Sequence, residues 1–128
     1  MIDIGIPYLN IIKHMESLIE KIFFISQGIR YVAIYVNGKL ISSERPNLEN
    51  SSSSDSDRYE ELIVNPTLLR LVIQRGNIDC GGAKFVIIRY GSFYEFVMPF
   101  MDGHLSVGME LNADVLMIIS SIQDLIPK

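Results

Sequence analysis

The amino-acid sequence predicts an α+β fold with the element order α-ββ-α-βββ-α. Apolar residues recur every three to four positions in three segments, which is typical of amphipathic helices. Short runs rich in β-branched and aromatic residues lie between these segments, and tight-turn dipeptides join the runs into hairpins. One domain is expected over residues 1–128, large enough to bury about two-thirds of its unfolded surface.

The first helix is expected over residues 8–26. Its apolar side chains share one face, while lysine and glutamate residues fall elsewhere: Ile11, Met15, Leu18, Ile22 and Ile25. Pro7 suits the first turn of such a helix, and Gly28 suits its end.

The first hairpin is predicted from strands over 29–36 and 39–45. Asn37-Gly38 lies between them, and a type I′ turn favours this pair because both central residues need positive φ. The first strand is apolar on both faces, which indicates an interior strand. The second strand becomes polar and ends at Pro46, as expected of a sheet edge protected from further pairing.

A low-complexity segment, NLENSSSSDSD, follows the hairpin. Its composition cannot sustain packing, so a mobile loop is expected at 46–57. A phosphorylation site and a cation-binding loop are the functional alternatives for this segment. Asp57 and Glu60 match a capping pattern that opens a helix over 58–75.

The central helix contains an Asn65-Pro66 pair, which predicts a restart with Asn65 as the cap. Gly76 is expected to end the helix. Glu60 and Glu61 are adjacent carboxylates, the residue type used in acid/base chemistry. Their place in the predicted first turn gives a structural explanation, because negative charge is favoured at the positive end of the helix dipole.

The last third of the sequence predicts three strands and a helix. Gly91-Ser92 and Asp102-Gly103 are the expected turns, and Asn112 is the expected cap of a helix over 113–126. The strands are the runs AKFVIIRY, FYEFVMPF and HLSVGMEL, at 83–90, 93–100 and 104–111.

The composition argues against several function classes. With 15 acidic and 11 basic residues the net charge is −4, and the basic residues are scattered, so a nucleic-acid partner is not expected. No apolar run approaches the length that spans a bilayer, and the N-terminus does not match a signal peptide. With a single cysteine, no internal disulfide forms, and a cytoplasmic location is the expectation.

Cys80 and His104 are the candidates for chemistry. A catalytic cysteine needs a depressed pKa, but Cys80 follows a helix C-terminus, the unfavourable end of the dipole. We expect Gly81-Gly82 to turn the chain and Cys80 to fill a small buried space. Asp102 and His104 are two potential metal ligands without an evident third. No catalytic residue, metal or cofactor is therefore predicted.

The order of elements over nearly the whole chain resembles the roadblock/LC7 group of profilin-like folds. The run YEELIVNPTLLRLVIQRGNIDCGG also looks like an uncharacterised archaeal family of small proteins. The first resemblance implies a five-stranded antiparallel sheet with the outer helices on one face and the central helix on the other. It also implies homo- or heterodimers that act without catalysis, as scaffolds or regulators of small GTPases and motors.

The sequence itself supports a homodimer through the strand at 84–90, which that topology places at a sheet edge. This edge is apolar and carries no proline, so a second copy would remove an aggregation hazard. The predicted interface comprises residues of the central helix and of this strand: Leu68, Leu69, Leu71, Val72, Ile73, Phe85, Val86, Ile87, Ile88 and Arg89.

Two other functions remain as alternatives to the scaffold. The first is a small-molecule sensor that holds a ligand between sheet and helices, with Tyr31, Tyr35, Tyr94 and Met98 lining the pocket. The second is a thiol- or metal-dependent enzyme that uses Cys80 and His104.

Overall fold

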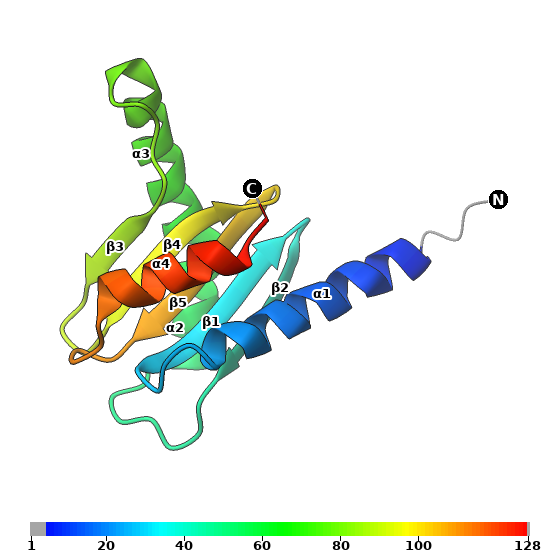
Figure 1. The fold of residues 1–128 in the computed structure, drawn as a ribbon, viewed down its shortest axis with the longest axis vertical. Coiled ribbons are helices and arrows are strands. Elements are labelled where there is room, and N and C mark those ends of the chain that lie inside the picture. Colours follow the sequence, from blue (N-terminus) through cyan, green and yellow to red (C-terminus); the bar gives the residue numbers. More distant parts are fainter. Residues whose placement is uncertain (1–4, 128) are drawn as a thin grey trace.

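The computed structural model describes residues 5–127, with side chains from residue 10, and it confirms the predicted α+β class and element order (Figure 1). Residues 1–4 and 128 of the predicted domain lie outside the described range. The elements are α1 (Gly5–Phe23), β1 (Ile29–Val36), β2 (Lys39–Glu44), α2 (Ser54–Tyr59), the π-helical turn η1 (Glu60–Val64), α3 (Asn65–Asp79), β3 (Val86–Arg89), β4 (Tyr94–Phe100), β5 (Gly103–Met109) and α4 (Val115–Leu125).

The described strands form one antiparallel sheet in the order β2-β1-β5-β4-β3. The central pairing joins the first hairpin to the last strand, with Val32 opposite Val107. Strands β2 and β3 are therefore the two edges, as predicted. Asn37 and Gly38 both have positive φ, 55° and 76°, so the predicted first turn is confirmed.

Helices α1 and α4 cover one face of the sheet, and the segment α2–η1 covers the other (Figure 1). The core lies on the α1–α4 side because the inward residues of the interior strands are apolar and alternate with the residues of the opposite face. It is built from Ile22, Val32, Ile34, Phe96, Leu105, Val107, Ile118 and Ile122, all with no exposed surface.

The central helical segment differs from the prediction at both ends. It begins at Ser54, where the Ser53 hydroxyl caps the helix by accepting from the Ser56 N–H at 3.1 Å. The expected loop at 46–57 is therefore shorter. At the other end the helix continues through Gly76 to Asp79. Gly76 permits a close approach instead, because a Cβ there would lie 2.7 Å from the Gly82 carbonyl carbon.

Three other boundaries also differ slightly from the prediction. The first helix ends at Phe23, three residues early. The β4–β5 turn is Met101-Asp102, because Phe100 pairs with Gly103 and Met101 takes positive φ. The last helix is capped by Asp114, whose carboxylate accepts from the Met117 N–H at 3.4 Å, whereas Asn112 was expected to be the cap. Within residues 5–127, no helix combines the length and apolar character needed to cross a membrane.

Candidate functional site

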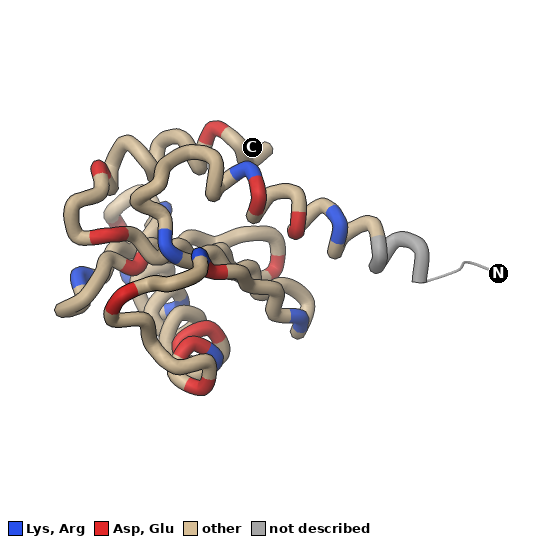
Figure 2. The backbone as a smooth tube through the Cα atoms, turned by 90° about the horizontal axis from the view of Figure 1, so that it is seen from below, with Lys and Arg blue, Asp and Glu red and all other residues tan. Residues whose placement is uncertain are grey.

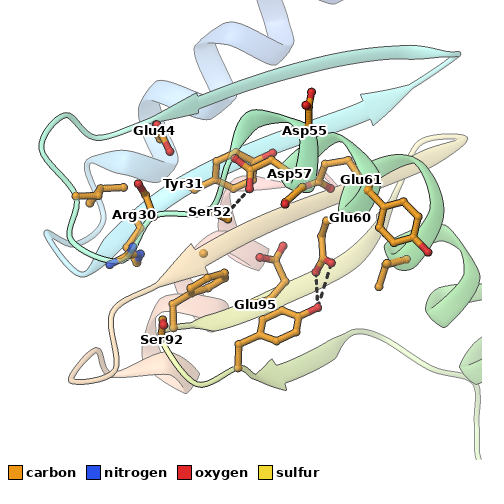
Figure 3. Close-up of a pocket in the computed structure, with 18 of the residues that line it drawn as sticks. Arg30, Tyr31, Glu44, Ser52, Asp55, Asp57, Glu60, Glu61, Ser92 and Glu95 are labelled. Atoms are coloured by element: carbon orange, nitrogen blue, oxygen red, sulfur yellow. Dashed lines mark hydrogen bonds between the residues drawn. The ribbon is translucent and has the colours of Figure 1, made fainter.

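A cavity of about 600 Å³ lies between the sheet and the segment α2–η1 (Figure 3). Tyr31, Gly108 and Glu95 of the three neighbouring strands β1, β5 and β4 lie along its floor. The loop after β2 and the turn between β3 and β4 close its ends. We call it the acidic pocket, because its lining carries six carboxylates: Glu44, Asp55, Asp57, Glu60, Glu61 and Glu95.

The π-helical turn η1 positions Glu61 over the sheet. Pro66 has no N–H to donate to the preceding turn, and the helix widens there so that the Asn65 N–H bonds the carbonyl of Glu60, five residues back. Asn65 has helical φ and ψ of −64° and −47°, so the predicted restart with Asn65 as cap is wrong. Its side chain instead turns inward, and its Nδ2 donates to Glu61 Oε1 at 3.0 Å.

Glu61 is the centre of a buried hydrogen-bond network. Its carboxylate has no exposed surface and accepts from His104 Nε2 at 2.8 Å and from the Ser106 hydroxyl at 2.7 Å. With the Asn65 amide, three donors satisfy the two oxygens, which is what makes a buried carboxylate tolerable. The first-turn dipole explanation for Glu61 is wrong, because the helix begins at Ser54 and Glu61 points into the protein.

Glu95 lies on the pocket floor, where only 3% of its surface reaches solvent and its Oε1 has no hydrogen-bond partner. Burial raises the pKa of this carboxyl well above its ordinary value, and the charges of Glu61 and Glu60 raise it further. The space beside it exists because Gly108 lies opposite in the register and has no side chain. Hydrogen bonding from Ser106 and Asn65 lowers the pKa of Glu95, but burial outweighs this effect.

Glu60 and Tyr90 form a second polar pair at the pocket wall. The Tyr90 hydroxyl donates to the two Glu60 oxygens, at 2.8 and 3.0 Å (Figure 3). Burial raises the pKa of Glu60, against the lowering effect of this hydrogen bond, and burial together with Glu60 raises the pKa of Tyr90. Burial also raises the pKa of Tyr31, with Glu61 adding to the shift.

Among the described residues, Arg30 is the one basic side chain in the pocket lining, and it is already paired with an acidic residue. Its NH1 donates to Glu110 Oε1 at 2.7 Å. Its NH2 donates to the Glu49 carbonyl at 2.8 Å, and this bond connects the loop after β2 to strand β1. The guanidinium also lies 5.5 Å from the centre of the Phe93 ring. The pocket therefore keeps a strong excess of acidic groups.

The predicted ligand-binding residues divide between the two faces of the sheet. Tyr31 lines the acidic pocket. Tyr35 lies on the same face but packs edge-on against His104, with ring centres 5.8 Å apart. Tyr94 and Met98 lie on the opposite face, against the apolar core. The structure thus brings only Tyr31 to the cavity.

The candidates for thiol and metal chemistry lie apart. Cys80 is exposed beside the α3 C-terminus, where its sulfur accepts from Arg75 at 3.3 Å, so its predicted burial is wrong. His104 is buried against Glu61, while Asp102 lies in the β4–β5 turn and accepts from the Asn37 N–H at 3.0 Å. Among the described residues, no three metal-binding side chains converge.

The second notable surface combines α3 with the β3 edge. Helix α3 leaves the sheet and projects beyond it (Figure 1). Leu69 is buried within the chain, whereas Leu71 and Ile78 are 59% and 76% exposed. Strand β3 is half-buried in alternation, with Ile87 and Arg89 the more exposed residues. We call this surface the α3–β3 edge.

The sequence carried signals for the acidic pocket that the prediction missed. Glu95 interrupts the otherwise apolar run FYEFVMPF, and a single carboxylate inside such a strand is unusual. His104 and Ser106 alternate with Leu105 and Val107, which places two polar side chains on one face of an interior strand. Glu61 carried no such signal, because its burial depends on where the helix begins.

In comparisons with known proteins, no protein-family model and no curated protein matches the chain.

Proposed function

We propose that this protein is a non-enzymatic, homodimeric interaction module whose two copies meet through the α3–β3 edge. The single observation that carries the proposal is the juxtaposition of an unpaired strand and a projecting helix with exposed apolar side chains. Each feature is costly in a monomer, since a free strand edge invites pairing and exposed leucine and isoleucine side chains lose the benefit of burial. One two-fold contact removes both costs.

The hydrogen-bond register of β3 supports an edge-to-edge pairing. The Tyr90 N–H donates to the Phe93 carbonyl, so Tyr90 forms a bonded pair and alternate residues back along β3 do the same. Ile87 and Arg89 fall between them and turn their N–H and C=O groups away from β4. A second β3, running antiparallel, would bond these groups and continue the sheet across the dimer.

Helix α3 would add the apolar part of the interface. Leu68, Val72 and Ile73 are half-buried in one chain and Leu71 is largely exposed, so a second helix packed alongside would cover them. Leu69, predicted to lie in the interface, is already buried in its own chain. A stable dimer of this kind is expected to bury roughly 1,200–2,000 Å² in total.

The proposal is tested by two pairs of matched variants. Ile87→Pro removes an outward N–H from the β3 edge, and Ser42→Pro places the same change at the exposed β2 edge. Leu71→Glu charges the projecting helix, and Leu116→Glu charges an equally exposed leucine on α4, 68% exposed. Light scattering over a dilution series is expected to show dimers for the wild type and both controls, and dissociation for Ile87→Pro and Leu71→Glu. A wild type that stays monomeric at high micromolar concentration refutes the dimer.

We propose that the dimer binds a small GTPase, and this part of the proposal is based on the roadblock/LC7 resemblance alone. The measurement is direct binding of a purified small GTPase to the wild type and to the monomeric Leu71→Glu variant. Binding that needs the dimer supports a scaffold. A dimer that binds no GTPase in either nucleotide state removes this partner and leaves the dimer itself standing.

A further inference from the structure

The acidic pocket lies under α2–η1, and no residue of α3 or β3 lines it. We propose that this pocket binds an organic cation, an ammonium or guanidinium group carried on an apolar body. Such binding is the step that the small-molecule-sensor alternative requires, and it does not depend on the oligomeric state.

The first support is the charge of the lining. Six carboxylates face one arginine there, and Glu110 already neutralises that arginine. Figure 3 shows Glu60 and Glu95 directed to the same side of the cavity, from η1 and from β4. Elsewhere the basic residues are dispersed along the backbone (Figure 2). Glu61 and Glu95 are buried and Asp57 and Glu60 are half-buried, and neighbouring acidic groups at reduced exposure favour a positive ligand.

The second support concerns burial rather than the number of charges, and it comes from Glu95. Its carboxyl is more than nine-tenths buried and lines the cavity, and its Oε1, which itself has less than 1 Å² of accessible surface, has no hydrogen-bond partner. The oxygens of buried carboxyls normally accept hydrogen bonds. A buried carboxyl oxygen without such a bond therefore lacks a donor. An ammonium or guanidinium group in the cavity supplies both the donor and the opposite charge.

The third support is the size and the remaining lining of the cavity. About 600 Å³ is a volume typical of sites for organic molecules and far exceeds that of a bare ion. Tyr31, Tyr59, Tyr90 and Phe93 contribute aromatic rings, which pack against an apolar body and attract a cation over their faces. In the described part of the chain the carboxylates do not converge in threes as a metal site needs, so the geometry favours the organic cation.

Binding is expected to release a proton. Burial and the facing charges of Glu60 and Glu61 raise the pKa of Glu95, while Tyr31, Tyr90 and Ser106 surround it as neutral groups and His104 contacts Glu61. The cation stabilises the charged carboxylate, so the proton leaves on binding. Affinity should therefore rise with pH until the ligand itself loses its charge.

The probes are 2-phenylethylamine and agmatine, compared with 2-phenylethanol and 3-phenylpropionate as neutral and anionic controls. Isothermal titration calorimetry is expected to show binding of both cations at least tenfold tighter than of either control. Titrations of 2-phenylethylamine in two buffers of different ionisation enthalpy are expected to show proton release. Equal affinity for 2-phenylethylamine and 2-phenylethanol, or no binding of either cation at millimolar concentration, overturns the proposal.

Matched variants test whether the cation binds in the acidic pocket. Glu95→Gln is expected to weaken 2-phenylethylamine binding at least tenfold and to abolish the proton release. Glu16→Gln, which removes one exposed carboxylate from α1, is expected to change the affinity less than twofold. Glu60→Gln serves as a second pocket variant, with folding of all three followed by circular dichroism. Unchanged affinity in both pocket variants overturns the proposal.

Discussion

The two faces of the sheet share the same strands and differ in almost everything else. On the α1–α4 face the inward residues, such as Ile34, Phe96 and Leu105, are apolar and fully buried. On the α2–η1 face the residues that alternate with them include Glu95, His104 and Ser106, and a cavity remains. The apolar face therefore contributes more packing, whereas the other face is packed less tightly and holds polar groups, so substitutions on the two faces should differ in their effect on the free energy of unfolding.

The largest effect is expected on the apolar face. Phe96→Ala should lower the free energy of unfolding by about 3–5 kcal/mol, because it removes a fully buried ring and leaves a cavity. Urea denaturation measures the loss. Phe24→Ala is the control, since that ring is 91% exposed, and it should stay within about 0.5 kcal/mol of the wild type. Similar losses in both variants would break the distinction.

On the polar face, Glu61→Gln should cost less, about 1–3 kcal/mol. His104, Ser106 and Asn65 all donate to the carboxylate, whereas the new amide nitrogen only donates, so Ser106 or His104 must turn into an acceptor and its own proton loses this partner. One buried donor is then left unsatisfied. Urea denaturation beside Glu16→Gln, an exposed carboxylate, provides the comparison. A neutral effect at Glu61 would mean that the network adds nothing to stability.

Glu95→Gln is expected to stabilise the protein, which no substitution in the apolar core should do. The folded-state pKa of Glu95 is raised above its ordinary value of 4.5, so the folded state holds the proton more tightly than the unfolded state. Stability that is fully present below that value is lost as the pH rises toward the folded-state pKa. The variant, which cannot ionise, should therefore be more stable than the wild type at neutral pH and equally stable below pH 4.5. Melting temperatures at both pH values test this, and a gain that is equal at both is inconsistent with it.

The smallest effect is expected at a position on neither face. Cys80 is exposed at the end of α3, so Cys80→Ser should change stability by less than about 0.5 kcal/mol. The same denaturation assay measures it. A loss near that of Glu61→Gln would indicate that Cys80 is buried in solution by a contact absent from the single chain.

How much of the structure could be predicted from the sequence also differs between the apolar face and the pocket face of the sheet. The strand at 29–36 and its turn could be predicted from the local sequence, because Asn37-Gly38 tolerates the positive φ that the hairpin needs. The central helix was harder, since Ser53 and Asp57 are both good caps and only packing decides between them. With Ser53 as the cap, Glu61 no longer lies in the first turn, where it was expected, and its side chain is buried. Alternation within a strand tells which of its residues share a face, but which residues of different strands share a cavity depends on the order of strands in the sheet.

The central position of β5 has a consequence for how the chain folds during synthesis. Strand β1 can pair with β2 early, but its second neighbour is present only when β5 is complete, because Val32 pairs with Val107 and the intervening elements must be made first. At about 5–20 residues per second, the ribosome needs on the order of ten seconds to do this. Through that interval the apolar inner side of β1 lacks its second neighbour, so the growing chain, rather than the finished protein, is the form that most needs a chaperone.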